Sequence, residues 1–277
     1  MFQSVYIYGL GMMGASLASA IRANKLAKNI YAYDIERKAL IYAKRKKIID
    51  DYEDKKYSYL SSADLIIICT PLSSYKSIFS QISKYNKRAY ITDIGSTKVS
   101  ITNLIPKNLQ DNFVGSHPLT GKESSSILNA DKNLFKSAVV LMTPTKITNK
   151  RVKLDVAKFW SNLTCKVHFI DLLVHDKVMS ITSHLPHLIS FALVNNVLSS
   201  NLIKNIKDYT GGGFEDFARL SRSNPLMWKD ICKTNKKNIL SSIVSLQKEL
   251  NKIKSLVRKS DNTLSKYFSK INNKLDK

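Results

Sequence analysis

Acidic residues are scarce in this chain of 277 residues, which has 21 aspartates and glutamates but 44 lysines and arginines, for a formal net charge of +23 at pH 7. A positive surplus of this size is a feature of many nucleic-acid-binding proteins. The lysines are spread along the whole chain, however, and we find no arginine-rich arm and no motif of stacking aromatic residues. We therefore predict a lysine-rich solvated surface that binds no nucleic acid. An intermediate alternative is that its positive field attracts anionic small molecules.

Cysteines and long apolar stretches are also scarce. The three cysteines (Cys69, Cys165 and Cys232) lack the spacing of metal ligands, which favours a reduced, cytoplasmic compartment and predicts no metal site. The longest apolar run, around residues 65–69, is far shorter than the roughly 20 residues that span a bilayer, so we expect no membrane partner. The N-terminus has no charged leader followed by an apolar segment, so we expect no signal peptide.

The first 170 residues alternate short apolar strand patterns with helical patterns. Strands are expected at residues 4–8, 29–34, 64–71, 137–144 and 166–171, and a strand followed by a loop at 89–98 and 112–118. The run at 64–71 is continuously apolar, as in a strand that is covered on both faces. This alternation predicts an α/β domain over residues 1–170, built on a mostly parallel, doubly wound sheet.

Residues 171–277 show helical patterns and no convincing strand. The last long pattern carries apolar residues at alternating spacings of four and three, a heptad-like seam formed by Ile239, Ile243, Leu246, Leu250, Ile253 and Val257. Ser260 and Asp261 indicate a break before a final helix. Such a seam packs either within one subunit or against a second one, and we favour a homodimer. The second region is therefore predicted to be an all-α helical dimerisation domain.

The segment GLGMMG follows the first strand and opens a helix, and Asp34 stands twenty positions after its last glycine at the end of the second strand. This context is typical of a Rossmann-type dinucleotide-binding turn, because glycines allow a tight turn and a close approach to the pyrophosphate. An acid at position 34 accepts hydrogen bonds from the ribose hydroxyls and repels a 2′-phosphate, so NAD is favoured over NADP, although Arg37 nearby weakens that preference. The cofactor-binding residues predicted in this turn are Gly9, Leu10, Gly11, Met12, Met13 and Gly14.

Several polar residues stand at or just after the ends of predicted parallel strands. In a doubly wound sheet, ligands bind beyond the carboxyl ends of the strands. Thr70, Pro71 and Asp93 are therefore expected beside the cofactor, and Ser96 and His117 in the same cleft. Thr70 and Asp93 have an alternative, equally weighted interpretation, in which they cap turns or helices. His117 lies in GSHPLTGKE between a short strand and a proline, where its imidazole would be rigidly aimed.

Two further groups lie in the helical region. His184 and His187 are three residues apart in SHLPH, a spacing that can place both side chains on one face of a helix. No carboxylate or cysteine nearby in the sequence would complete a metal site with them. We expect one of them to point into the cleft and the other to hold the helix. Arg219 is suited to bidentate carboxylate recognition, although by itself a surface pair with Asp216 is the simpler interpretation.

Five motifs, in order, together resemble the prephenate dehydrogenase (cyclohexadienyl dehydrogenase) family: GLGMMG, DIGSTK, GSHPLTGKE, HDKVMSITSHLPH and GGGFEDFARLSRSNPLMW. The resemblance covers most of the chain up to about residue 231. It implies a Rossmann-type domain followed by a helical dimerisation domain. It also implies oxidative decarboxylation of prephenate to 4-hydroxyphenylpyruvate with NAD as the hydride acceptor, on the route to tyrosine.

The same resemblance assigns roles to individual residues. His117 matches the family's catalytic histidine, Ser96 the serine that contacts this histidine and the substrate hydroxyl, and Arg219 the arginine that binds a substrate carboxylate. Glu123 matches an acidic residue near the cleft mouth, and His187 a contact to the substrate side chain. Further active-site or supporting positions are matched by His184, Gly212, Asp216 and Trp228.

Three alternatives remain open from the sequence. Arogenate carries an ammonium group in place of the keto group of prephenate, and an acid such as Glu123 or Asp216 would favour it. A β-hydroxyacid dehydrogenase shares the two-domain plan. Such enzymes usually depend on a lysine on a long helix, and no lysine of this sequence has comparable neighbours. A non-enzymatic NAD-binding sensor, or a nucleic-acid-associated regulator that uses the basic surface, would explain the charge but not the polar residues predicted in one cleft.

Overall fold

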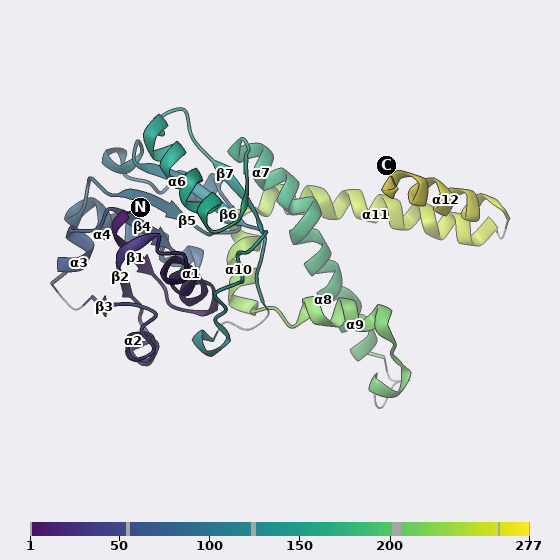
Figure 1. Ribbon diagram of the computed structural model, residues 1–277. Helices are drawn as coiled ribbons and strands as arrows, with labels where there is room; N and C mark the ends of the chain where they lie inside the picture. Colours follow the sequence, from purple (N-terminus) through teal and green to yellow (C-terminus); the bar gives the residue numbers. More distant parts are fainter. Residues whose placement is uncertain (1, 54–55, 123–125, 201–205, 260, 277) are drawn as a thin grey trace.

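The computed structural model describes residues 2–53, 56–122, 126–200, 206–259 and 261–276. Figure 1 shows an α/β domain formed by the N-terminal part of the chain and a group of helices that extends away from it. The predicted class, a doubly wound sheet followed by an all-α region, is confirmed.

One sheet of eight strands forms the α/β domain, in the order β3-β2-β1-β4-β5-β6-β7-β8. Neighbouring strands are parallel except β6 and β7, which are antiparallel. The sequence patterns located seven of these strands but missed β3, whose two residues are too few to show a periodicity. The strands are β1 (Phe2–Tyr8), β2 (Ala27–Tyr33), β3 (Asp51–Tyr52), β4 (Leu65–Ile68), β5 (Tyr90–Asp93), β6 (Phe113–Pro118), β7 (Val139–Thr143) and β8 (Lys166–Phe169).

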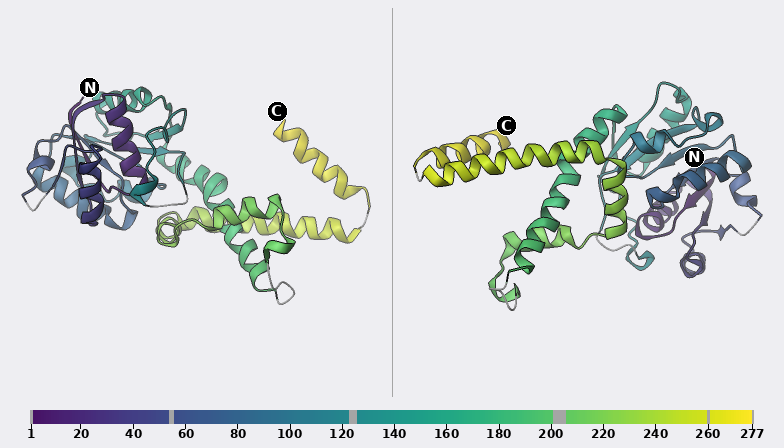
Figure 2. Two further views of the ribbon diagram at one scale, coloured as in Figure 1. Left: turned by 60° about the horizontal axis from the view of Figure 1, so that its bottom comes forward. Right: turned by 180° about the vertical axis from the view of Figure 1, so that it is seen from behind.

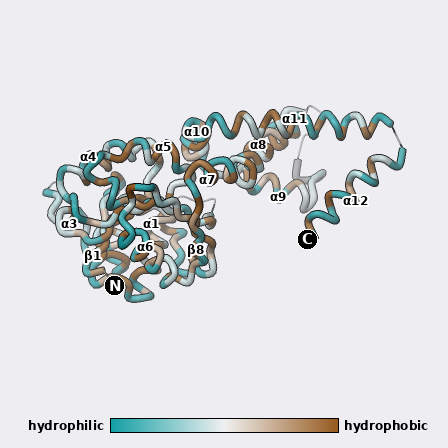
Figure 3. The backbone as a smooth tube through the Cα atoms, turned by 90° about the horizontal axis from the view of Figure 1, so that it is seen from above, coloured by the Kyte–Doolittle hydropathy of each residue, from teal (hydrophilic) through white to brown (hydrophobic). Residues whose placement is uncertain are grey.

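Helices cover both faces of the sheet, which explains why β4 is apolar and buried at every position. One face packs a core that includes Leu17, Ile21 and Trp160. The opposite face packs a second core that includes Phe79 and Ile82. Brown, hydrophobic backbone accordingly runs through the middle of this domain in Figure 3. The helices of the domain are α1 (Met12–Ala23), α2 (Arg37–Arg45), α3 (Ser58–Ser61), α4 (Tyr75–Tyr85), α5 (Val99–Thr102) and α6 (Lys150–Asn162).

The helical region begins with one continuous rod, in which α7 (Leu172–Met179) passes through a π-helical segment (Ser180–His184) into α8 (Leu185–Leu198). A π-helical insertion widens the turn locally, and such insertions are frequent at functional sites. Figure 2 shows that α10 lies against the α/β domain while α11 and α12 project away from it. The remaining helices are α9 (Gly212–Ser221), α10 (Pro225–Thr234), α11 (Lys236–Lys259) and α12 (Thr263–Leu275).

The helical region leaves much apolar surface uncovered in a single chain. Along the predicted seam of α11, Ile239 is 3% exposed, whereas Leu250 and Val257 are 54% and 56% exposed. The predicted break at position 261 is present, because α11 ends at Lys259 and the Asp261 carboxylate accepts from the Thr263 amide at 2.8 Å. Exposed apolar side chains in this number favour association with a second molecule. Other exposed apolar side chains of these helices are Leu173, Val174, Val178, Ile181, Leu198, Phe217, Leu226, Met227, Leu240, Val244, Phe268, Ile271 and Leu275.

Candidate active site

The GLGMMG turn requires its glycines on steric grounds. Gly9 has φ +90°, and a Cβ at Gly14 would lie 1.9 Å from the Gly9 carbonyl oxygen. Gly11 is the N-cap of α1 and carries no side chain there, so the first amides of the helix are open to an anionic group. The Asp34 carboxylate accepts hydrogen bonds from the amides of Leu10 at 2.6 Å and Glu36 at 2.8 Å. Asp34 thus also holds the turn itself in place, a role that sequence reasoning missed.

The strand register places the ends of β1, β4, β5 and β6 side by side. Tyr8 pairs with Ile68, Ile68 with Asp93, and Asp93 with Gly115. The segments that follow these strands therefore meet at one edge of the sheet and carry the glycine turn, Thr70, Ser96 and His117. The hydroxyl oxygen of Thr70 is buried without a hydrogen-bond partner among the described residues, so it is available to a ligand at this edge.

Asp93 lies beneath this edge and not on its surface. Its carboxylate is fully buried and accepts from the Lys98 ammonium at 2.7 and 2.8 Å. It also accepts from the amide of Gly95 at 2.9 Å and from the hydroxyl of Tyr75 at 3.1 Å. Lys98 donates further to the Ser116 carbonyl oxygen at 2.6 Å and thereby links the DIGSTK loop to β6. We therefore assign Asp93 a structural role in place of the predicted cofactor contact.

Lys98 is a buried residue of the candidate site that sequence reasoning missed. It is 1% exposed in a chain whose many other lysines gave no reason to expect a buried one. Burial lowers the pKa of the Lys98 ammonium, whereas Asp93 acts in the opposite direction. Because a buried charge is stable only when it is paired, Lys98 and Asp93 depend on each other.

His117 ends a chain of three buried side chains. Its Nδ1 lies 3.0 Å from Nε2 of His175, and Nδ1 of His175 lies 2.8 Å from Oδ1 of Asp176. His175 and Asp176 belong to α7 and are 0% and 1% exposed, whereas His117 is 8% exposed at the end of β6. The same Asp176 carboxylate accepts from the backbone amides of Lys98 at 2.8 Å and Val99 at 3.0 Å. This group joins the helical region to the α/β domain.

Burial keeps these histidines neutral. It lowers the pKa of His117 well below its usual value, and the neighbouring His175 and Lys98 lower it further. Burial also lowers the pKa of His175, against the hydrogen bond to Asp176, which raises it. His184, which is 1% exposed, has its pKa lowered by burial to about 4. All three imidazoles therefore resist protonation in the folded chain.

These depressed pKa values predict that the fold is less stable in acid. Above the usual histidine pKa of 6.5 both the folded and unfolded chains hold neutral imidazoles; below it the unfolded chain binds protons that the folded chain does not. We expect the free energy of unfolding to fall by about 1 kcal/mol per pH unit for each such histidine between pH 6.5 and its folded pKa. Urea denaturation of the protein at about pH 7 and pH 5 checks this, and an unchanged midpoint would contradict it.

The two histidines of the SHLPH segment have different surroundings, because His184 is buried and His187 is only half-buried. Nδ1 of His184 lies 3.1 Å from Nδ2 of Asn235, an amide that also donates to the Asp176 carbonyl oxygen at 2.7 Å. His187 is only partly buried, and its ring stacks on that of Trp228 with centroids 4.3 Å apart. The Trp228 ring also meets His184 edge-on at 6.1 Å.

Three polar groups in this part of the site have unused hydrogen-bonding capacity, and one of them is the buried Nε2 of His184, which has no partner among the described residues. The indole nitrogen of Trp228 is buried without a partner among the described residues. The Nδ1–H of His187 donates to the Ser183 carbonyl at 2.9 Å, which leaves Nε2 of His187 for another contact. The Ser96 backbone raises the pKa of His184, which indicates that the DIGSTK loop adjoins SHLPH.

The residues predicted around the substrate carboxylate lie on α9, in the exposed part of the helical region. Arg219, Asp216 and Gly212 lie on α9 and are exposed, and α9 packs against α8. A Cβ at Gly212 would meet nothing within 4 Å, so one chain alone does not explain that glycine. Glu123 lies outside the described residues.

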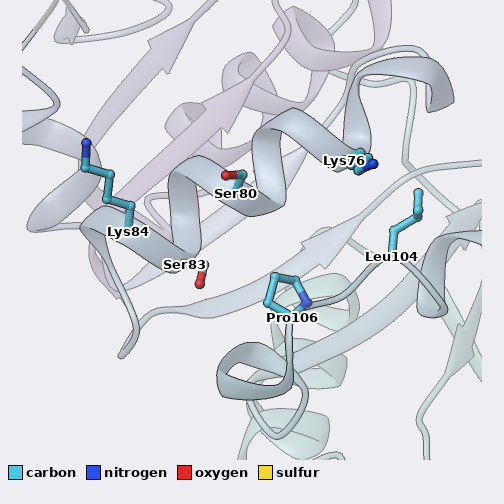
Figure 4. A pocket seen from close by; sticks show the side chains of 6 residues that line it. All are labelled: Lys76, Ser80, Ser83, Lys84, Leu104 and Pro106. Carbon is cyan, nitrogen blue, oxygen red and sulfur yellow. The ribbon is translucent and has the colours of Figure 1, made fainter.

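The described part of the chain also has a surface hollow that lies outside the predicted site. A hollow of about 350 Å³ on the outside of α4 is lined by Lys76, Ser80, Ser83, Lys84, Leu104 and Pro106 (Figure 4). None of these residues belongs to the predicted site. Among the described residues, no three His, Cys, Asp or Glu side chains gather as metal ligands do. No described helix is both long and apolar enough to cross a membrane.

A Rossmann-type domain whose strand ends present a glycine turn and a buried histidine, joined to a helical domain, defines a two-domain nucleotide-dependent dehydrogenase. The chain matches the models of two prephenate dehydrogenase domains, the nucleotide-binding domain over residues 17–169 and the dimerization domain over residues 173–270. The chain therefore belongs to the prephenate dehydrogenase family. The second match supports a homodimer.

Individual relatives agree with this assignment. The prephenate dehydrogenase of Bacillus subtilis is 32% identical over 97% of this chain and 74% of its own length. The cyclohexadienyl dehydrogenase of Zymomonas mobilis is 28% identical over 94% of this chain and 90% of its own. A crystal structure of prephenate dehydrogenase from A. aeolicus, in complex with hydroxyphenyl propionate and NAD+, superposes with a TM-score of 0.92 at 33% identity, covering 99% of this chain and 97% of that one.

Proposed function

We propose that this chain is an NAD-dependent prephenate dehydrogenase, which converts prephenate to 4-hydroxyphenylpyruvate and CO₂. The observation that carries the proposal is the buried His117 at the edge of the sheet that also carries the glycine turn. The relatives in Bacillus subtilis and A. aeolicus support the same activity.

The residues of the glycine turn fit the cofactor. Gly9 and Gly14 allow the tight turn, because a Cβ at either would clash with neighbouring backbone, and Gly11 puts no side chain at the N-terminus of α1, where a pyrophosphate would bind. The hydroxyl of Thr70 lacks a partner among the described residues at the same edge. Asp34 favours NAD over NADP, because its carboxylate repels a 2′-phosphate. The crystal structure of the A. aeolicus relative contains NAD+. When bound, NAD supplies the acceptor for the hydride.

The chain's own residues move the proton. An imidazole nitrogen of His117 accepts the proton of the ring hydroxyl as hydride leaves the ring carbon that carries this hydroxyl. A positioned base of this kind contributes about 10²–10⁴-fold to the rate. Ser96, which the family resemblance assigns to the same hydroxyl, would contact it from the loop that follows β5. Loss of CO₂ then follows, because it makes the ring aromatic.

The helical region supplies the other contacts to the substrate. Prephenate carries two carboxylates and a keto group, all of which accept hydrogen bonds. The unpartnered indole N–H of Trp228 and the adjacent His187 suit the side-chain end of the substrate. Arg219 suits a carboxylate through bidentate bonds. Because α9 and the seam of α11 are exposed in one chain, we infer that the homodimer completes this side of the cleft.

Arogenate is the second candidate substrate. The acidic side chains exposed on α9, Glu215 and Asp216, would suit its ammonium group. The similarity to a cyclohexadienyl dehydrogenase is also consistent with this candidate.

An assay of NADH and NADPH formation with prephenate and with arogenate, each with NAD and NADP, tests the proposed function. We expect the highest kcat/KM for the pair of prephenate and NAD. A higher kcat/KM for arogenate would assign the second candidate, and no turnover with either substrate would refute the proposed function.

A further inference from the structure

We propose that His175 and Asp176 are positioning residues that force His117 into the tautomer whose Nε2 is unprotonated, so that this atom is the base. The proposal rests on the proposed function for its role in turnover. Its structural basis is the row of two short hydrogen bonds, at 3.0 Å between the two imidazoles and 2.8 Å between His175 and Asp176.

The direction of each bond follows from the carboxylate. An ionised carboxylate only accepts hydrogen bonds, and three donors surround that of Asp176: the amides of Lys98 and Val99, and Nδ1 of His175. Nδ1 of His175 must therefore carry a proton. Because His175 is neutral, its Nε2 has a lone pair and accepts from Nδ1–H of His117. Neutral His117 then has its lone pair on Nε2.

The same row stabilises the charge that forms during the reaction. When Nε2 of His117 takes the substrate proton, the imidazolium is held by its Nδ1–H bond to His175, which is bonded in turn to the Asp176 carboxylate. The other charged and titratable groups that act on the two imidazoles are Lys98 and His184, which disfavour protonation of His117, and Asp93, which favours protonation of His175. Asp176 is the carboxylate bonded directly into the row.

Asp176 also forms hydrogen bonds to two other segments of the candidate site. Its carboxylate binds the backbone that follows Ser96, through the amides of Lys98 and Val99. Its carbonyl oxygen accepts from Asn235, which also bonds His184. One residue of α7 thus aligns the base and anchors both the DIGSTK loop and the supporting histidine of SHLPH. If Asp176 served only to hold the two regions together, it would not need its hydrogen bond to His175, the residue that contacts His117.

Two substitutions at position 175 separate positioning from packing. His175→Gln places an amide oxygen where Nε2 was, so it still accepts from His117, whereas His175→Leu fills similar space without an acceptor. We expect kcat to stay within about tenfold of the wild-type value in the Gln variant and to fall by about 10²-fold or more in the Leu variant. The Kd for NAD and the KM for prephenate should change little in both.

Equal kcat values in the two variants, whether both high or both low, would overturn the proposal. Thermal unfolding and NAD titration show whether each variant is folded, independently of turnover. If the wild-type protein turned over neither substrate, the proposed function would fail while the tautomer remained measurable.

The tautomer is measured directly by ¹⁵N NMR of the histidine-labelled wild-type protein at neutral pH, with the His117 signals assigned by comparison with His117→Asn. We expect Nδ1 of His117 to be protonated and Nε2 to be unprotonated. The opposite pattern would overturn the proposal, whatever the variants show.

Discussion

Replacing His117 with asparagine is expected to lower kcat by about 10²–10⁴-fold, the contribution of a positioned general base. The amide of asparagine occupies the place of Nδ1, so the contact with His175 at the back of the site is kept. What the variant lacks is Nε2, the atom that faces away from His175 and takes the substrate proton. The loss should therefore fall on kcat and not on cofactor binding.

Steady-state kinetics and NAD titration of the purified variant check this result. His168→Asn is the matched control, because His168 is an exposed residue of β8 and should tolerate the same change without loss of kcat. A kcat for His117→Asn within about tenfold of the wild-type value would remove His117 from the role of base. A greatly weakened Kd for NAD would indicate a structural effect instead.

Replacing Lys98 with methionine is expected to lower the free energy of unfolding by about 3–5 kcal/mol, because it leaves Asp93 charged, fully buried and without its cation. The methionine fits the channel of the lysine side chain but cannot donate to the Ser116 carbonyl. Since this bond fixes β6 just before His117, we also expect kcat to fall.

Urea denaturation checks the loss of stability. Lys44→Met is the matched control, because Lys44 pairs with Asp51 at 2.8 Å on the surface and this pair should contribute little. The double variant Asp93→Asn/Lys98→Met removes both charges and should be more stable than Lys98→Met alone. If Lys98→Met and Lys44→Met were equally stable, the buried pair would not have the role assigned to it.

The local features of the fold were predictable because neighbouring residues determine them. An apolar run such as β4, or a glycine turn between a strand and a helix, carries its pattern within a few positions. Two features lack such a local pattern: β3, whose two residues show no period, and the burial of Asp93. A strand-end acid has the same sequence signature whether it faces a ligand or is buried under a lysine.

Much of the candidate site was also predictable, but not its internal connections. Family-like motifs singled out His117, His184 and His187 as candidate site residues. The roles of Lys98 and His175 were missed, because a lysine among many lysines and a histidine beside an aspartate have ordinary surface interpretations. Only their burial distinguishes them.

The family, the order of the two domains, the glycine turn with its preference for NAD and the candidate base could all be read from the motifs of the chain. Which nitrogen of the candidate base is free follows only from the folded arrangement. That choice depends on a hydrogen bond between residues 58 positions apart, His117 on β6 and His175 on α7. Hydrogen bonds act over about 3 Å in space, and no local pattern in the chain records which distant side chains the folding of two domains brings within that distance.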